Sequence, residues 1–254
     1  MKIKILGCSG GIGSGRHTTC MMVDDDILID AGSGITSLSL EQLEAVDHVF
    51  ITHAHLDHVL GLPLLLDSVG DRRGRPVKVH ALPEVLEVLS AHLFNWHLWP
   101  DFRAIPTIDS PWMEFEALPL GTCLELDGRT FSALPAKHIV PACGLRISTA
   151  SGSLAFSGDT TSSDALVEAL NAIPDLRHLI IETSFENELA EVARVSMHHW
   201  PDSLAAELKR LRVRPEVWIT HLKPGNEAAI MEELAAVAPE WNLRALQQGQ
   251  VIEI

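Results

Sequence analysis

The sequence has few cysteines, and they do not follow any spacing typical of a metal or redox pair. There are four, and none lies in a CxxC motif: Cys8, Cys20, Cys123 and Cys143. No apolar stretch approaches the ~20 residues that a membrane span requires. The N-terminus also lacks the long apolar core and the cleavage site of a signal peptide. We therefore expect a cytoplasmic protein with reduced thiols and no membrane association.

Basic residues are scarce as well. The chain has 19 Lys and Arg against 34 Asp and Glu, for a formal net charge of −15, and no long basic insertion. Binding of long nucleic acids depends on many Lys and Arg contacts to phosphates, so this balance disfavours such a partner. A substrate with a single phosphate group remains compatible, because bound metal ions can supply local positive charge.

Nucleotide-binding glycine motifs are missing too. The segment GCSGGIGSG follows a first expected strand at residues 2–6, but it contains neither GxGxxG nor a Walker lysine. We interpret it as a tight turn near the functional site. No internal repeat or low-complexity linker divides the 254 residues, so we expect a single domain spanning residues 1–254.

The segment THAHLDHVLG, residues 52–61, is the most informative part of the sequence. It follows the apolar run Val49–Ile51, which is typical of a strand buried on both faces. Imidazole and carboxylate groups together suit zinc, iron or manganese. Four such groups fall within six positions: His53, His55, Asp57 and His58. Alternation lets the first two reach one ion, and the adjacent pair can turn towards a second.

Further polar residues follow expected strands elsewhere: His138, Asp159, Glu182 and His221. Strands alternate with helical and hairpin-like stretches, including a hairpin turn at residues 127–128, which predicts two mixed sheets covered by helices.

Asp30 also ends a strand, and we interpret it as a carboxylate supporting the ligands. A helix is expected from Pro83 to Leu98. The aromatic side chains of Phe94–Phe102 could form a core plug, a wall over the site or a homodimer face.

These stretches resemble the metallo-β-lactamase superfamily. Within it, THAHLDHVLGL, HLFNWHLWPDF, SGDT, IETSF, ITHLKP and the pattern HHWPDSL are similar to class II cyclic-nucleotide phosphodiesterases. HIVPACGLRI, IETSF and HHW also resemble ribonuclease Z. The resemblance implies an α/β fold, the αββα four-layer sandwich of two mixed β-sheets flanked by helices.

The same resemblance implies two divalent ions, zinc in the first instance, with manganese or iron as alternatives. One ion would take His53, His55 and His138, and the other Asp57, His58 and His221. Asp159 would bridge the two. The implied activity is hydrolysis of the 3′,5′-cyclic nucleotides cAMP and cGMP to 5′-monophosphates, by attack of metal-bound hydroxide.

The leaving ribose oxygen needs a proton, and we expect His199 to donate it. Glu182 would hold the other ring nitrogen of His199, and Asp57 would orient the nucleophile. His198 is the second choice, because adjacent side chains point in different directions.

Several alternatives remain on the sequence alone. The phosphodiester could belong to precursor tRNA, as for ribonuclease Z, or to another small molecule such as a cyclic ribose phosphate. The same metal ions could serve β-lactam or thioester hydrolysis. A non-enzymatic alternative is a metal-binding scaffold without activity.

Overall fold

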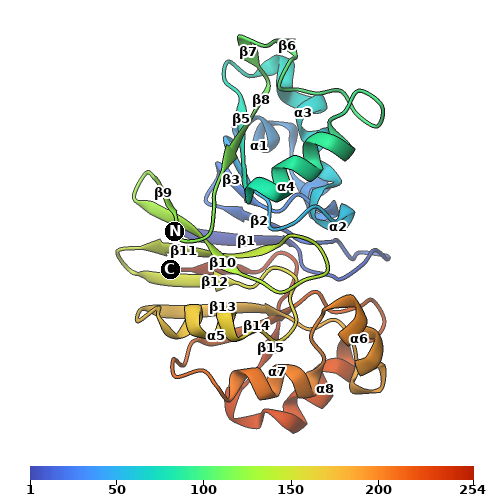
Figure 1. Ribbon diagram of the computed structural model, residues 1–254, viewed down its shortest axis with the longest axis vertical. Helices are drawn as coiled ribbons and strands as arrows, with labels where there is room; N and C mark the ends of the chain where they lie inside the picture. Colours follow the sequence, from blue (N-terminus) through green and yellow to red (C-terminus); the bar gives the residue numbers. More distant parts are fainter.

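The computed structural model describes residues 1–254, and two seven-stranded sheets pack face to face at its centre (Figure 1). In spatial order, the strands of the first sheet are β16 (Val251–Glu253), β1 (Lys2–Gly7), β2 (Cys20–Val23), β3 (Ile27–Ile29), β4 (His48–Phe50), β5 (Val77–Ala81) and β8 (Met113–Ala117). Those of the second sheet are β15 (Arg244–Ala245), β14 (Glu216–Thr220), β13 (Leu176–Glu182), β12 (Gly152–Phe156), β11 (Cys143–Thr149), β10 (Arg129–Pro135) and β9 (Cys123–Leu126). Strands β6 (Pro106–Thr107) and β7 (Ser110–Pro111) form a separate small hairpin.

Helices cover the outer face of each sheet (Figure 1). The helices of the first half are α1 (Leu40–Ala45), α2 (Leu56–Val59), α3 (Gly61–Val69) and α4 (Pro83–Val88). Those of the second half are α5 (Asp164–Asn171), α6 (Ala190–Ser196), α7 (Pro201–Leu208) and α8 (Glu227–Val237). Buried side chains of α5, α7 and α8 pack on the outer face of the second sheet. The order helix, sheet, sheet, helix confirms the predicted four-layer sandwich.

Both sheets are mixed, with an antiparallel and a parallel part. β3, β4, β5 and β8 run parallel, as do β12, β13, β14 and β15. Every residue of β3 and of β12 is buried, as expected for short apolar runs covered on both faces. The predicted hairpin is confirmed: β9 and β10 pair antiparallel around Asp127 and Gly128, whose φ angles are +49° and +78°.

The helix expected from Pro83 to Leu98 is shorter than predicted. α4 ends at Val88, a π-helical turn spans Leu89–Leu93, and irregular backbone follows. Asn95 explains why no helix continues to Leu98, because its side-chain oxygen accepts hydrogen bonds from the amides of His97 and Leu98 at 3.0 and 2.8 Å. A side chain that takes over backbone hydrogen bonds in this way favours a turn over a helix.

The aromatic cluster of this region is divided between core and surface. Phe94 and Phe102 are buried in the core, which agrees with the core-plug interpretation for these two rings. Trp96, in contrast, is 62 % exposed. No helix in the structure has both the length and the apolar character needed to cross a membrane.

Candidate metal centre

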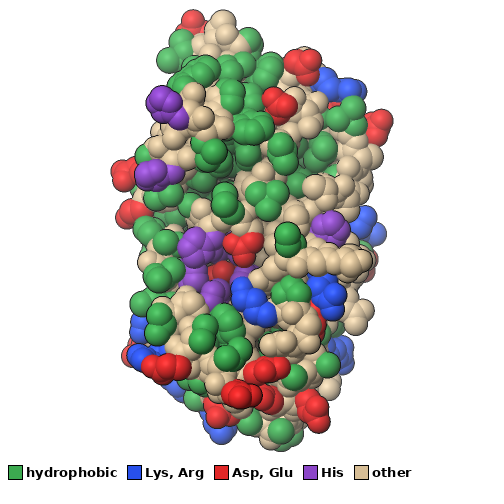
Figure 2. Space-filling view, turned by 90° about the vertical axis from the view of Figure 1, so that its right-hand side faces the viewer, with side chains coloured by type: hydrophobic (Ala, Val, Ile, Leu, Met, Phe, Trp, Pro, Cys, Tyr) green, Lys and Arg blue, Asp and Glu red, His purple; other side chains and the backbone are tan.

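The polar residues singled out in the sequence meet at one edge of the two sheets. The segment that contains His53 and His58 follows β4, and Asp159 and His221 follow β12 and β14. These three strands belong to the parallel parts of their sheets, whose carboxyl ends are where α/β folds collect ligands. His138 joins them from the loop after β10. Figure 2 shows histidine side chains gathered with acidic ones in a hollow on this face, below a largely hydrophobic surface.

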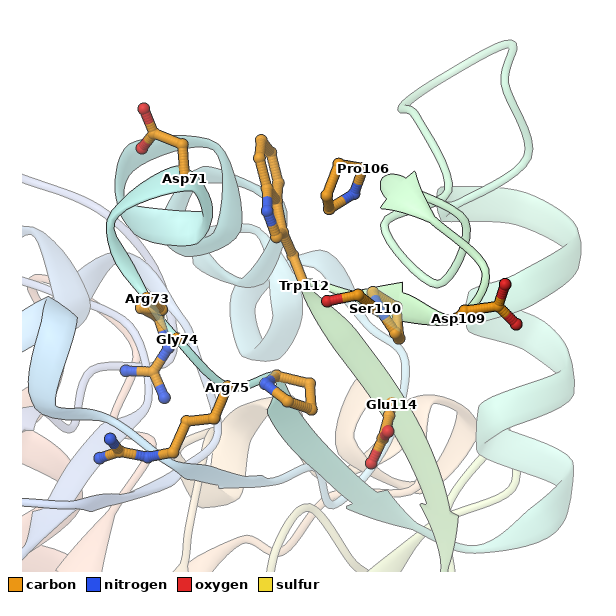
Figure 3. A pocket seen from close by; sticks show the side chains of 11 residues that line it. Asp71, Arg73, Gly74, Arg75, Pro106, Asp109, Ser110, Trp112 and Glu114 are labelled. Atoms are coloured by element: carbon orange, nitrogen blue, oxygen red, sulfur yellow. The ribbon is translucent and has the colours of Figure 1, made fainter.

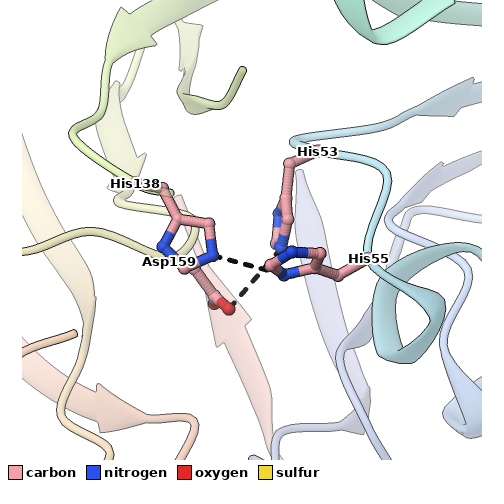
Figure 4. Close-up of side chains that lie close together, drawn as sticks. All are labelled: His53, His55, His138 and Asp159. Atoms are coloured by element: carbon pink, nitrogen blue, oxygen red, sulfur yellow. Dashed lines mark hydrogen bonds and ion pairs between the residues drawn. The ribbon is translucent and has the colours of Figure 1, made fainter. Parts of the chain in front are cut away.

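A first group of donor atoms contains three histidines and one aspartate: His53, His55, His138 and Asp159 (Figure 4). One nitrogen or oxygen from each lies within 4.8 Å of all the others. The Nε2 atom of His138 lies 3.3 Å from Nδ1 of His55. The Nε2 atom of His53 lies 3.6 Å from Oδ2 of Asp159. The four side chains come from both sheets and point towards a common centre.

The second group shares Asp159 with the first and adds Asp57, His58 and His221. The Nε2 atom of His221 lies 3.3 Å from Oδ2 of Asp57 and 3.3 Å from Oδ2 of Asp159. The Nε2 atom of His58 lies 3.4 Å from Oδ1 of Asp159. All seven side chains predicted from the sequence therefore converge, and one carboxylate lies between the two groups.

The residues fit a divalent cation, because two buried ring nitrogens lack a hydrogen-bond partner. The Nε2 atoms of His53 and His58 are fully enclosed, and no hydrogen bond satisfies them. Such orphaned polar atoms are costly inside a protein. Each points at the Asp159 carboxylate from a distance beyond normal hydrogen bonding. A cation between these atoms would satisfy them, and nitrogen and carboxylate donors suit zinc, manganese or iron.

The other ring nitrogen of four of the histidines is held by a neighbouring oxygen. This arrangement is common around metal-binding histidines, because it fixes the tautomer and the ring orientation. The contacts are His53 with the Thr52 hydroxyl (3.1 Å), His58 with the Asp30 carboxylate (2.7 Å), His138 with the Met197 carbonyl (3.2 Å) and His221 with the Ser184 hydroxyl (2.8 Å). Asp30 thus supports a histidine of the centre, as predicted from its position at the end of a strand.

The electrostatics of the groups favour charged carboxylates. Burial by itself would raise the pKa of Asp159, but His221 and His58 outweigh it and hold the pKa far below the usual value. Burial also acts against a charged His58, yet Asp159 and Asp30 raise its pKa well above normal. A cation bound at this position would displace that proton. Burial lowers the pKa of His53, which keeps that ring neutral and able to act as a ligand.

The Gly-rich turn after β1 packs against the centre, as expected. A Cβ at Gly10 would lie 2.3 Å from the carbonyl oxygen of His221, so only glycine fits there. His221 itself has φ of +61°, an unusual backbone conformation for a residue other than glycine. The turn therefore supports a ligand held in a strained conformation, which is typical of functional sites.

The predicted arrangement of His199 and Glu182 is wrong. Glu182 holds the neighbouring ring instead: its Oε1 lies 2.7 Å from Nδ1 of His198. The ring of His198 stacks on His221 with centroids 5.2 Å apart and lies 5.0 Å from the ring of His138. His198, not His199, is therefore the histidine beside the candidate metal centre.

His199 points in the opposite direction. It is completely buried, and its Nδ1 lies 2.9 Å from the Ser203 hydroxyl. Its Nε2 lies 3.6 Å from Oε1 of the buried Glu207. Only the backbone amide of His199 approaches Glu182, at 3.4 Å. The physical reason is that both residues lie in the non-helical segment between α6 and α7, where adjacent side chains point in different directions.

A third set of donors, Glu182, His198 and His221, also lies within 4.8 Å. Here hydrogen bonds account for the proximity. The Ser184 hydroxyl lies 3.2 Å from Nδ1 of His198 and 2.8 Å from Nδ1 of His221. Sequence reasoning did not identify Ser184 or the Met197 carbonyl as part of the site. Ser184 lies two residues after Glu182, a spacing that could have drawn attention to it.

A four-layer sandwich with two histidine and carboxylate groups sharing one aspartate is the architecture of a metal-dependent hydrolase. Residues 25–222 match the family model described as the beta-lactamase superfamily domain. The chain belongs to this superfamily.

Among curated proteins, the chain is 26 % identical to a probable 3′,5′-cyclic-nucleotide phosphodiesterase of Yersinia pestis, covering 88 % of this chain and 78 % of that protein. It is 33 % identical to a ribonuclease Z of Bradyrhizobium diazoefficiens, covering 54 % of this chain and 46 % of that protein. Among solved structures, unliganded yeast PDE1 superposes with a TM-score of 0.84 at 20 % identity, covering 100 % of this chain and 99 % of that chain. The superposition supports the fold, and the family match supports a metal-dependent hydrolase.

Proposed function

We propose that the protein is a dinuclear metal-dependent phosphodiesterase that hydrolyses 3′,5′-cyclic nucleotides to 5′-monophosphates. The observation that carries this proposal is the position of Asp159, which belongs to both donor groups at once. A shared carboxylate would hold two ions close together, and such a pair serves in-line displacement at phosphorus. His53, His55 and His138 would hold one ion, Asp57, His58 and His221 the other, and Asp159 would bridge them.

When bound, such ions lower the pKa of a coordinated water and offset negative charge on the phosphate. Zinc suits the nitrogen-rich donors best, and manganese and iron are alternatives. Elemental analysis of protein purified without added metal would identify the ion. A ratio of two ions per chain supports the proposal, and a ratio below one contradicts it.

The side chains of this protein supply the proton chemistry. As the P–O3′ bond breaks, the leaving oxygen needs a proton, and His198 lies beside both donor groups. Burial would lower the pKa of His198, but the Glu182 carboxylate outweighs burial and raises it, which favours the protonated ring. Glu182 occupies Nδ1, which leaves Nε2 as the atom that donates. We therefore assign the role of proton donor to His198 in place of His199.

Asp57 is the remaining carboxylate at the opening. Burial by itself would raise its pKa, but the hydrogen bond to His221 and the charge of His58 lower it far below the usual value. Its side chain is 32 % exposed, more than that of any other member of its group. An ionised, accessible carboxylate in this position can orient the attacking water as well as bind an ion.

A second candidate function is cleavage of precursor tRNA, supported by the 33 % identity to the ribonuclease Z of Bradyrhizobium diazoefficiens. The net charge of −15 works against it, because RNA binding rests on cationic contacts. A panel of cAMP, cGMP, cyclic ribose phosphates and precursor tRNA, assayed with the metal-loaded protein, separates these functions. Asp159→Asn is the matched control and should abolish turnover of the true substrate. If cyclic nucleotides remain intact while tRNA is cut, the first proposal fails.

A further inference from the structure

A cavity of about 570 Å³ opens directly beside His138, a residue of the first donor group. Its size lies within the range of roughly 300–1,000 Å³ that is usual for small-molecule sites. Apolar side chains from three separate segments form its walls: Leu82 and Pro83 at the start of α4, Leu120 after β8, and Val140 and Pro141 after His138. The cavity is therefore in the right place to receive the part of a substrate that does not react.

The wall that carries Val140 and Pro141 is tied to the metal centre at both ends. The amide of Lys137 donates to the Thr160 hydroxyl at 2.9 Å, and the amide of Thr161 donates to the Lys137 carbonyl at 2.9 Å. Both threonines follow Asp159 directly in the sequence. These bonds fix the start of the loop relative to the bridging carboxylate.

The far end of the same loop is fixed to the other sheet. The amide of Cys143 donates to the Thr52 carbonyl at 3.0 Å, and Ala142 pairs with His53 in an isolated β-bridge. The cavity wall thus has a set position relative to His53 as well as His138. A preorganised wall adds binding energy without the cost of ordering a loop when the substrate arrives.

The lining chemistry favours a flat heterocycle. Apolar side chains, three of them prolines, form most of the lining, and one cation and one anion, Lys137 and Glu84, also belong to it. An aliphatic chain would gain nothing from the two charges, and a bare sugar phosphate would leave the apolar walls exposed to water. A nucleobase has two apolar faces and hydrogen-bonding groups around its edge, so it matches both features.

A second cavity, of about 500 Å³, is a poorer candidate (Figure 3). It lies at the end of the molecule near β6 and β7, and none of the seven donor residues lines it. Arg73 and Arg75 border it, but both guanidinium groups are paired with Asp47, at 2.6 and 2.7 Å. No free cation therefore faces a phosphate there.

We propose that the cavity beside His138 is the subsite for the base of a nucleotide substrate. This proposal rests on the proposed phosphodiesterase function, because it assumes that the phosphate lies at the metal centre. It also deepens that function, since it makes the base a determinant of catalytic efficiency.

The test compares cyclic nucleotides with a 3′,5′-cyclic deoxyribose phosphate that lacks a base, using the metal-loaded protein and ³¹P NMR to follow hydrolysis. We expect kcat/KM to be about 100-fold higher with a base than without one, mostly through KM, because the apolar contact is made in the ground state as well. The double variant Leu120→Ser, Val140→Ser should lower kcat/KM about tenfold for cyclic nucleotides and leave the base-free compound unchanged. Ile108→Ser, at a residue 79 % exposed and outside the cavity, is the matched control.

A binding measurement separates failure of this subsite from failure of the proposed function. Free guanosine and adenosine are titrated into methyl-labelled protein, and shifts are expected at Leu120 and Val140 and not at Ile108. Nucleoside binding in this cavity supports the subsite even when no cyclic nucleotide is hydrolysed. The absence of hydrolysis would contradict only the proposed activity. Equal hydrolysis of base-containing and base-free substrates, or nucleoside shifts absent from Leu120 and Val140, overturns the subsite.

Discussion

His198 and His199 are neighbours in the chain with opposite surroundings. His198 pairs with Glu182, lies beside two histidines of the candidate metal centre and is 8 % exposed. His199 faces Ser203 and Glu207 in the interior and is completely buried. Each has a nearby carboxylate, so residue type alone does not separate the proposed catalytic pair from the buried structural one. What separates them is the space that each ring faces.

The largest expected effect is on turnover when His198 is replaced. His198→Ala should reduce kcat by about 10²–10⁴-fold, because the leaving oxygen loses its proton donor. His199→Ala is the matched variant and should change kcat no more than severalfold. Steady-state kinetics on cyclic nucleotides, with metal content measured for both proteins, checks this. A larger loss in the His199 variant at full metal content would reverse our assignment.

Replacing Glu182 should have a smaller effect that also depends on pH. Glu182→Gln should lower kcat by about 10–100-fold, since the carboxylate orients and charges the ring. As a proton donor, His198 is active below its pKa, so kcat falls as pH rises through that value. Because Glu182 raises the pKa against the effect of burial, the basic limb of the pH profile should move to lower pH in the variant. An unmoved limb would show that another group donates the proton.

His199 should matter for stability. In His199→Ala the buried Ser203 hydroxyl and Glu207 carboxylate lose their neighbour, at a cost of about 1–3 kcal/mol in the free energy of unfolding. Urea denaturation monitored by circular dichroism measures this difference. His199→Asn is the comparison, with a smaller expected loss because its amide can replace Nδ1 as the partner of the Ser203 hydroxyl. The reverse order of stabilities would contradict the structural role of His199.

The smallest effect is expected at Ser203. Its hydroxyl accepts a hydrogen bond from the Trp200 amide at 3.0 Å and contacts His199 at 2.9 Å. Ser203→Ala should cost about 0.5–1.5 kcal/mol of unfolding free energy and leave kcat unchanged. Thermal and urea unfolding, with kinetics on the same preparation, check both statements. Reduced turnover in a variant of unchanged stability would show that the buried His199 and Ser203 side chains influence the active site.

Much of the architecture could be predicted because its signals are local. Short apolar runs indicated β4 and β12, and a polar residue after each run placed His53 and Asp159 at the same edge of the sandwich. The hairpin turn at Asp127 and Gly128 could likewise be predicted from two adjacent residues. These features depend on a few neighbouring residues and on the rule that carboxyl ends of parallel strands meet.

The parts that could not be predicted depend on contacts between distant segments. The direction of the His198 ring is decided by Glu182 at the end of β13, sixteen residues earlier. The helix expected up to Leu98 fails for a local reason, because the Asn95 side chain bonds to backbone amides that follow it. His138 is held by the carbonyl of Met197, 59 residues away, and a backbone carbonyl leaves no trace in residue identity.

Each donor group draws on both sheets, since His53 and His58 follow β4 of one sheet while Asp159 and His221 follow strands of the other. An ion bound there would be coordinated by residues of both sheets and would therefore link the two halves of the sandwich. The unfolding equilibrium of the whole chain would then be coupled to the free concentration of the metal. When the metal is scarce in a cell, the less stable chain would be degraded by proteases. The cell would then lose the protein itself as well as its metal-dependent activity.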